Sequence, residues 1–388
     1  MINSISSTGT TFLFLTRKII TYAIENNFSF ALWRRPGRSS FYLLVCNQFE
    51  LLPELQPENL PSGFVFAPFD PQQQKYYLKA SLLIEVQADG NYDLISGTMP
   101  DVEHQTHFTP AYYTFPDTAE EESLPDFESL VRACKTGISQ GKFEKVVASR
   151  KKKVALNNGA DPLLLLESMA KTYDQALVYL IGIPTEGTWL GATPEPLISL
   201  DSNNIFRTVA LAGTRVFNPD IPISQVTWKQ KEIEEQALVE RYIISCFKKI
   251  RIREYEEYGP KTYRAGNLLH LRSDFFVDLN QVKYPELLTV MLRLLHPTSA
   301  VCGMPMAEAM EFLKHQEGYN RSFYSGYLGP VNIENETDIF VNLRCLKWLG
   351  SSAVLFAGAG ITADSDPAAE FHESEVKMET LNSLLKKL

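Results

Sequence analysis

The chain has 388 residues, of which 45% are hydrophobic and 21% are charged. This balance is typical of a globular protein with a large core, and it fits either two average domains or one large α/β domain. The net charge of −9 argues against a general nucleic-acid binder, because phosphate contacts need clustered Lys and Arg. No apolar run approaches the length of a membrane span, and the five scattered cysteines form no C-x-x-C pair. We therefore expect a soluble, cytoplasmic protein with reduced thiols, no zinc site and no disulfide framework.

The first part of the chain, up to about residue 115, alternates short apolar runs with turns. Ser29–Trp33 and Ser40–Cys46 flank a basic turn and predict a hairpin. Tyr76–Gln87 and Tyr92–Ile95 flank an Asp-Gly-Asn turn and predict another. Pro110–Pro125 is rich in Pro, Thr and Glu, and is either a domain linker or a long surface loop within one domain. Nothing here indicates chemistry, so this part is expected to be scaffold.

Hydrophobic periods of 3.6 and 2 residues predict helices and strands from residue 126 onward. The predicted helices are Asp126–Ser139, Pro162–Lys171, Trp228–Ile250, Tyr284–Leu295 and Pro305–His315. The predicted strands are Lys145–Arg150, Ala176–Ile183, Thr188–Leu190, Thr208–Ala212, Ile339–Trp348 and Ala353–Phe356.

Four polar side chains stand out among these elements. Lys145 begins a strand, Glu195 lies between two prolines that deny it a helix, and His270 interrupts a short apolar segment. Each has an ordinary explanation: a solvated lysine, a turn residue and a hydrogen-bonded structural histidine. Arg344 has apolar neighbours in a predicted strand, so we expect it to bind a carboxylate of the protein or of a ligand.

Two E-x-x-E pairs suggest a site for a metal and an anion. A C-terminal helix is predicted to begin at Asp366-Pro367 and to place Glu370, Glu373 and Lys377 on one face. It follows an apolar strand that ends in a glycine turn at Phe356–Gly360. One such pair is most often a solvated helix face. The second pair, Glu232 and Glu235, makes a shared carboxylate site the stronger hypothesis.

A series of motifs in one order resembles the chorismate-utilising enzymes. The motifs are KVVASR at 145–150, GATPEPL at 191–197, LAGTR at 211–215, KEIEEQ at 231–236, HLRS at 270–273, HPTSAVCG at 296–303, FYSG at 323–326, NLRC at 342–345, GAGI at 358–361 and AAEFHESEVK at 368–377. The family includes isochorismate synthase, salicylate synthase, anthranilate synthase component I and aminodeoxychorismate synthase component I. The resemblance covers about residues 126–388.

The resemblance implies an α/β (α+β) fold. It is a single large domain of two antiparallel sheets packed face to face, with helices outside and the site deep between. Residues 1–388 would then form one chorismate-binding domain, with 1–115 as an N-terminal scaffold part and 126–388 as the catalytic part. On this reading Pro110–Pro125 is a loop rather than a domain boundary.

Three features indicate which member of the family the chain is most similar to. Members that add water carry a lysine at the head of the KVVASR motif, as Lys145 does here, whereas ammonia-using members tend to have glutamine. Ala212 stands where aminodeoxychorismate synthases have a nucleophilic lysine, and no glutaminase-like segment is fused. The resemblance therefore implies an isomerase, isochorismate synthase, ahead of salicylate synthase. Gln236, where many members have histidine, and Tyr324, at a variable position, assign no lyase activity.

The resemblance also implies residue roles in converting chorismate to isochorismate. Lys145 is the base that activates water, Glu195 is the acid, and His270 lies near the C4 side. Mg²⁺ would be the cofactor, since carboxylate oxygens without His or Cys suit it. The implied metal and substrate residues are Glu235 and Glu373 as direct ligands, Glu232 and Glu370 on metal-bound water, Lys377, Gly213, Thr214 and Gly358 at the ring carboxylate, and Arg344 and Tyr324 at the enolpyruvyl carboxylate.

Several alternatives stay open at this point. Salicylate synthase would eliminate pyruvate after the shared step, and an anthranilate synthase component I-like enzyme is a further possibility. A non-catalytic, metal-dependent anion-binding protein on the same scaffold is the alternative outside enzymes. The product could serve menaquinone or siderophore biosynthesis, and a monomer without a glutaminase subunit, nucleic acid or membrane partner is expected.

Overall fold

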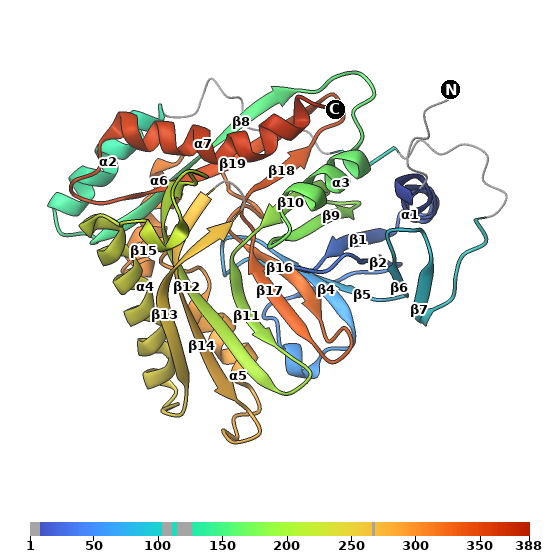
Figure 1. The fold of residues 1–388 in the computed structure, drawn as a ribbon, viewed down its shortest axis with the longest axis horizontal. Helices are drawn as coiled ribbons and strands as arrows, with labels where there is room; N and C mark the ends of the chain where they lie inside the picture. The colour runs from blue at the N-terminus through green and yellow to red at the C-terminus, as the bar shows by residue number, and fades with distance from the viewer. Residues whose placement is uncertain (1–7, 103–110, 115–125, 266–267) are drawn as a thin grey trace.

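The computed structural model describes residues 8–102, 111–114, 126–265 and 268–388. Within these residues two large antiparallel sheets pack face to face, and helices cover their outer faces (Figure 1). The predicted mixed α/β (α+β) fold with two antiparallel sheets and outer helices is therefore confirmed. No helix in the described ranges is long and apolar enough to cross a lipid bilayer.

The first sheet has ten strands in the described part of the chain. In spatial order they are β15 (Gly303–Met304), β8 (Lys145–Ala155), β19 (Ser352–Ile361), β18 (Cys345–Trp348), β10 (Gly187–Thr193), β9 (Leu177–Ile183), β1 (Ser29–Arg34), β2 (Phe41–Cys46), β6 (Leu82–Val86) and β7 (Tyr92–Gly97).

The second sheet has nine strands among the same residues. Their spatial order is β13 (Glu256–Ala265), β14 (Leu268–Asp278), β12 (Ile205–Val216), β11 (Pro196–Leu200), β17 (Thr337–Val341), β16 (Tyr327–Val331), β4 (Gly63–Ala67), β5 (Lys75–Lys79) and β3 (Glu50–Leu52).

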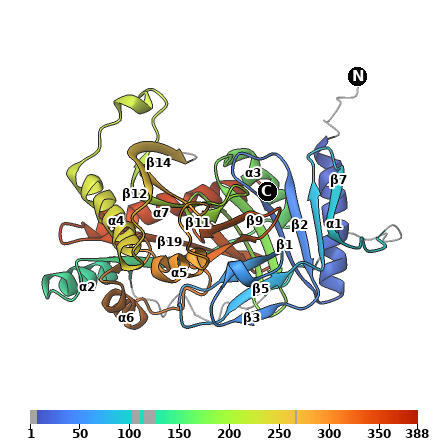
Figure 2. The ribbon, with the colours of Figure 1, turned by 90° about the horizontal axis from the view of Figure 1, so that it is seen from below.

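The helices divide between the two sheets. Those packed on the first sheet are α1 (Thr8–Glu25), α2 (Phe127–Ser139), α3 (Pro162–Thr172) and α7 (Pro367–Leu385). Those on the second sheet are α4 (Gln230–Lys249) and α5 (Leu287–Leu295), while α6 (Met306–Gln316) packs beside β15 and β8. Figure 2 shows α1 and β7 at one end of the molecule and α2, α4 and α6 at the other.

Both faces of the central strands are buried, which explains their continuous apolar sequences. In β1, Ala31 and Trp33 join the aromatic core between the sheets, whereas Phe30 and Leu32 join the core under the helices. Successive strand residues point to opposite faces, so a strand covered on both sides needs apolar residues throughout. The aromatic core between the sheets fixes their separation close to the site described below.

The structure corrects three local predictions. Ile339–Trp348 is not one strand: β17 and β18 belong to different sheets, and the chain crosses between them at Arg344. Phe356–Gly360 is not a turn, because β19 runs on to Ile361. Tyr76–Gln87 is likewise divided, into β5 of one sheet and β6 of the other, but the predicted hairpin across the Asp-Gly-Asn turn is confirmed by the pairing of β6 with β7.

The predicted hairpin of β1 and β2 is confirmed, whereas α1 and β13 were not predicted. Of the predicted loop Pro110–Pro125, only residues 111–114 lie within the described ranges.

Candidate active site

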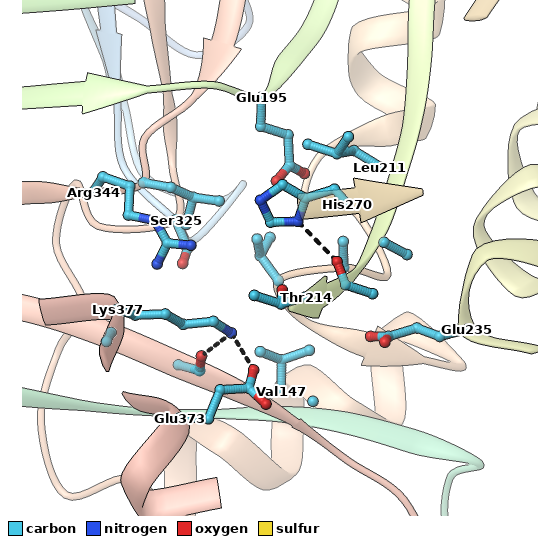
Figure 3. Close-up of a pocket in the computed structure, with 18 of the residues that line it drawn as sticks. Val147, Glu195, Leu211, Thr214, Glu235, His270, Ser325, Arg344, Glu373 and Lys377 are labelled. Atoms are coloured by element: carbon cyan, nitrogen blue, oxygen red, sulfur yellow. Dashed lines mark hydrogen bonds and ion pairs between the residues drawn. The ribbon is translucent and has the colours of Figure 1, made fainter. Parts of the chain in front are cut away.

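A cavity of about 130 Å³ lies between the sheets, where α4 and α7 approach each other. Its walls come from the β10–β11 junction, from β12, β14 and β19, from the crossover between β17 and β18, and from the two helices. Figure 3 shows Glu195 and Arg344 on one side and Lys377, Glu373 and Glu235 on the other. Segments far apart in the sequence therefore converge on one pocket.

The cavity gathers most of the residues that the sequence singled out. Its lining includes Glu195, His270, Gly213, Thr214, Tyr324, Arg344, Gly358, Lys377, Glu232, Glu235 and Glu373. Lys145 and Glu370 are buried just behind this lining, each paired with a residue that belongs to it. The sequence reasoning missed Lys231 and Ser325, although each lies inside a motif that it had quoted.

Glu195 projects into the cavity from the junction of β10 and β11. The Val341 backbone N–H donates to the Glu195 carbonyl over 2.9 Å, which fixes the main chain at this point. The side chain is reached from the cavity, yet protein atoms surround it. Burial raises the pKa of Glu195 to about 7, although Arg344, Lys377 and Lys145 act in the opposite direction. Near neutral pH this carboxyl can therefore carry a proton and act as an acid.

Lys145 lies at the start of β8 with a side chain that is only 4% exposed. Its Nζ donates to Glu235 Oε1 over 2.7 Å, so the amine is held against the wall of the cavity. Burial alone would raise the pKa of Glu235, but the neighbouring Lys145 ammonium outweighs it and the net shift is downward. The pair places an amine just behind the lining of the cavity that Glu195 enters, where its charge acts to lower the pKa of Glu195.

A second lysine–glutamate pair forms on α7. Lys377 Nζ lies 2.6 Å from Glu373 Oε1 and donates to the Gly358 carbonyl over 2.9 Å (Figure 3). Burial would raise the pKa of Glu373, but Lys377 holds it below its ordinary value. The Gly358 carbonyl therefore accepts a hydrogen bond from Lys377. Gly358 itself lies inside β19 and not in an open turn.

A third pair joins the two carboxylate helices. Lys231 on α4 lies 3.1 Å from Glu370 on α7, and the glutamate is buried while the lysine is partly exposed. Glu232 has a different role, because its carboxylate accepts the backbone N–H of Lys229 and caps the start of α4. Both E-x-x-E pairs therefore face the same region, and three of the four carboxylates hold a lysine.

The donor chemistry of this region fits Mg²⁺. Among the described residues, no three His, Cys, Asp or Glu side chains are arranged to hold a metal ion. Lys145, Lys231 and Lys377 each form an ion pair with a carboxylate that could also bind a cation. Mg²⁺ needs only one or two carboxylates and completes its shell with water. Glu235 and Glu373 line one cavity and sense each other's charge, so together they could supply such a pair.

Arg344 and Tyr324 form a cationic and aromatic wall. Arg344 lies in the crossover between β17 and β18 with a φ of 48°, in the left-handed region. Its guanidinium makes no hydrogen bond or ion pair with any residue that the structure describes, and burial lowers its pKa. Tyr324 is buried and stacks on Phe356 with ring centroids 5.4 Å apart. A half-buried guanidinium without a partner among the described residues is suited to bind a carboxylate from a ligand.

His270 presents an unprotonated ring nitrogen to the cavity. Its Nδ1 lies 2.8 Å from the Gly213 carbonyl, which can only accept, so Nδ1 carries the hydrogen. Gly213 has a φ of 67° at a bulge in β12, which turns that carbonyl toward the ring. Burial and the Arg344 charge lower the His270 pKa to about 4. The buried Nε2 has no hydrogen-bond partner among the residues that the structure describes, so it is available as an acceptor.

Comparison with known proteins agrees with this geometry. The chorismate binding enzyme family matches residues 68–386. The chain belongs to this family. The match begins earlier than the motif-bearing region that starts at residue 126, and so includes part of the region before it.

Relatives of this chorismate-binding enzyme include isochorismate synthases. It is 28% identical over 276 residues to "Isochorismate synthase MenF" of Bacillus subtilis, covering 69% of this chain and 57% of that protein. It is 26% identical over 273 residues to "Isochorismate synthase EntC" of Escherichia coli, covering 68% of this chain and 69% of that protein. The alignment thus spans less than two thirds of the Bacillus protein.

Solved structures show the same fold. The structure of MenF from Escherichia coli, described as the menaquinone-specific isochorismate synthase, matches with a TM-score of 0.74 at 21% identity over 94% of this chain and 91% of that one. Anthranilate synthase component I from Streptococcus pneumoniae matches with a TM-score of 0.65 at 16% identity over 91% of this chain and 89% of that one. In this chorismate-binding enzyme the pocket between the sheets brings together a carboxyl whose pKa is raised to about 7 and a guanidinium that has no partner among the described residues, with a lysine amine held by Glu235 just behind the lining.

Proposed function

We propose that this chorismate-binding enzyme is an isochorismate synthase, which converts chorismate to isochorismate. The observation that carries the proposal is the Glu195 carboxyl, whose pKa burial raises to about 7, in the same cavity as Glu235, which holds the Lys145 amine just behind the lining. A lysine at position 145 and the sequence relatives named isochorismate synthase support water as the nucleophile.

The reaction exchanges one hydroxyl for another on the ring. Lys145, once unprotonated, takes a proton from a water molecule whose oxygen forms a bond to C2. The double bonds shift, the C4–O bond breaks, and Glu195 donates its proton to the departing hydroxyl, which leaves as water. One water is consumed and one is released, so substrate and product are isomers. Arg344 and Tyr324 hold the enolpyruvyl carboxylate and keep the ring between base and acid.

We also infer that Mg²⁺ assists at the ring carboxylate. Glu235 and Glu373 would hold it directly, with Glu232 and Glu370 on its water molecules. When bound, the ion supplies positive charge that offsets the carboxylates of protein and substrate. The chain's own contribution at this end is Lys377, which contacts Glu373 and Gly358, together with the backbone of Gly213 and Thr214.

The organisation that goes with this activity is part of the same proposal. Residues 1–388 would act as one chorismate-binding domain, in which 126–388 carry the chemistry and 1–115 support it. We further propose that the enzyme works as a cytoplasmic monomer without a glutaminase subunit. Its product would enter menaquinone or siderophore biosynthesis, the two routes considered from the sequence.

The test is a turnover assay of the purified protein with chorismate and Mg²⁺, with products separated by chromatography. Isochorismate should form, and Lys145→Met and Glu195→Gln should each lose at least roughly a hundredfold in kcat. Two surface variants, Lys171→Met and Glu128→Gln, are the matched controls. Each changes one partner of a separate surface ion pair and should keep full activity. Formation of salicylate would show the bifunctional enzyme instead, and absence of turnover would refute the proposal.

A further inference from the structure

A second, smaller cavity of about 30 Å³ adjoins the active-site cavity. The two share Pro194, His270 and Arg344 as a common wall, and Pro194 is the residue directly before the acid Glu195. A buried water molecule needs about 10–15 Å³ of cavity volume. The second cavity can therefore hold one or two water molecules but no organic substrate. It therefore lies next to the acid end of the site, at the size of a water pocket.

The polar groups of this cavity are suited to water. Within the described part of the chain, His270 Nε2 is an acceptor without a partner and the donors of Arg344 are unused. The Tyr173 hydroxyl, by contrast, already donates to the Thr380 carbonyl over 2.7 Å. Ala176, Ala192 and Leu268 supply apolar walls. The free hydrogen-bonding groups thus gather at the wall shared with the active site.

The proposed reaction, on which this inference rests, releases a water molecule at that wall. Glu195 protonates the hydroxyl on C4, and the resulting water forms between Glu195 and His270 while the ring still fills the main cavity. That water can donate to His270 Nε2 and to the newly ionised Glu195, and accept from Arg344. Three such partners are typical of a buried water. The main cavity therefore does not have to hold this water together with the ring.

We propose that the second cavity receives the water that leaves C4 and is its route out of the active-site cavity. Beyond it, Gln175 and Pro194 also line a third cavity of about 370 Å³, which therefore adjoins the second. The bond that breaks is C4–O, the proton comes from Glu195, and the product is neutral water. The ligand class of the second cavity is therefore water alone.

The test fills the second cavity. Ala192→Val and Ala176→Val each add two methyl groups at buried lining positions. Ala353→Val is the matched control, because Ala353 is equally buried in the same apolar cluster and lines neither cavity. Each enzyme is assayed in ¹⁸O-water, and ¹⁸O at C4 of the chorismate recovered at partial conversion is measured by mass spectrometry. This label appears when the departed ¹⁶O-water has left before the reaction reverses.

The filled variants should lose roughly tenfold or more in kcat at unchanged KM. This loss is about the effect of removing one hydrogen bond from the transition state. They should also incorporate less ¹⁸O per turnover. Ala353→Val should match the wild type in both. The proposal is wrong if folded filled variants match the control in kcat and in label, or if chorismate re-formed by the wild type stays unlabelled at C4. If neither variant folds, the wild-type label still tests whether the released water leaves before the reaction reverses. The proposed function fails separately, if the wild type makes no isochorismate.

Discussion

The raised pKa of Glu195 predicts a specific dependence of folding stability on pH. In the folded protein burial raises this pKa from 4.5 to about 7. Below pH 4.5 both states hold the proton, so the group has no effect. Between the two values the unfolded chain loses the proton and the folded protein keeps it, so stability falls as pH rises. Above pH 7 the full cost of about 3 kcal/mol is present.

Replacing this carboxyl with an amide removes the titration. We expect Glu195→Gln to be close to the wild type in unfolding free energy at pH 5, and about 2 to 3 kcal/mol more stable relative to it at pH 8. Urea unfolding at both pH values measures the difference. The exposed Glu257→Gln should show no such change. A difference between Glu195→Gln and wild type that stays constant from pH 5 to pH 8 would refute the burial argument.

Three further predictions concern the base, the wall beside it and the metal. Gly360→Ala should lower kcat roughly tenfold or more with little loss of stability, because a Cβ there would lie 3.0 Å from Lys145 Cε and displace the amine; an unchanged kcat would contradict this. Arg321→Lys should lower the free energy of unfolding, measured in urea, by about 3 kcal/mol or more. The buried Arg321 pairs with Glu317 and also donates to two backbone carbonyls, and lysine would lose those two hydrogen bonds. The exposed Arg132→Lys is its control, and a cost below about 1 kcal/mol would contradict the argument. EDTA should abolish turnover and added Mg²⁺ restore it, with full activity in EDTA as the contrary result.

Local signals explain why the two carboxylate helices could be predicted from the sequence. Asp366 accepts the backbone N–H of Ala369 over 2.9 Å as the N-cap of α7, and Pro367 occupies the first turn. These contacts join residues three apart, so a short window of sequence contains them. The partner of Glu235 could not be found in this way, because Lys145 is 90 residues distant along the chain.

Arg344 shows where sequence reasoning ends. Apolar residues continue on both sides of it, so residues 339–348 have the pattern of one buried strand. Only the pairing of β17 with β11 and of β18 with β10 separates the two halves into different sheets. The glycines of β19 were wrongly predicted to form a turn for a related reason. The lack of a side chain at Gly360 leaves room for Lys145, and the strand continues through this position.

The site distinguishes its five glutamates by their neighbours rather than by their type. Glu235, Glu370 and Glu373 each lie within 3.1 Å of a lysine nitrogen, and Glu232 caps a helix. Glu195 forms no ion pair with any described residue, and burial dominates its pKa. The lysines hold the pKa values of Glu235 and Glu373 down, which suits carboxylates that must stay ionised to bind a cation. Because burial raises the pKa of Glu195 to about 7, this carboxyl is suited to donate a proton near neutral pH, whereas Glu235 and Glu373 are suited to stay ionised.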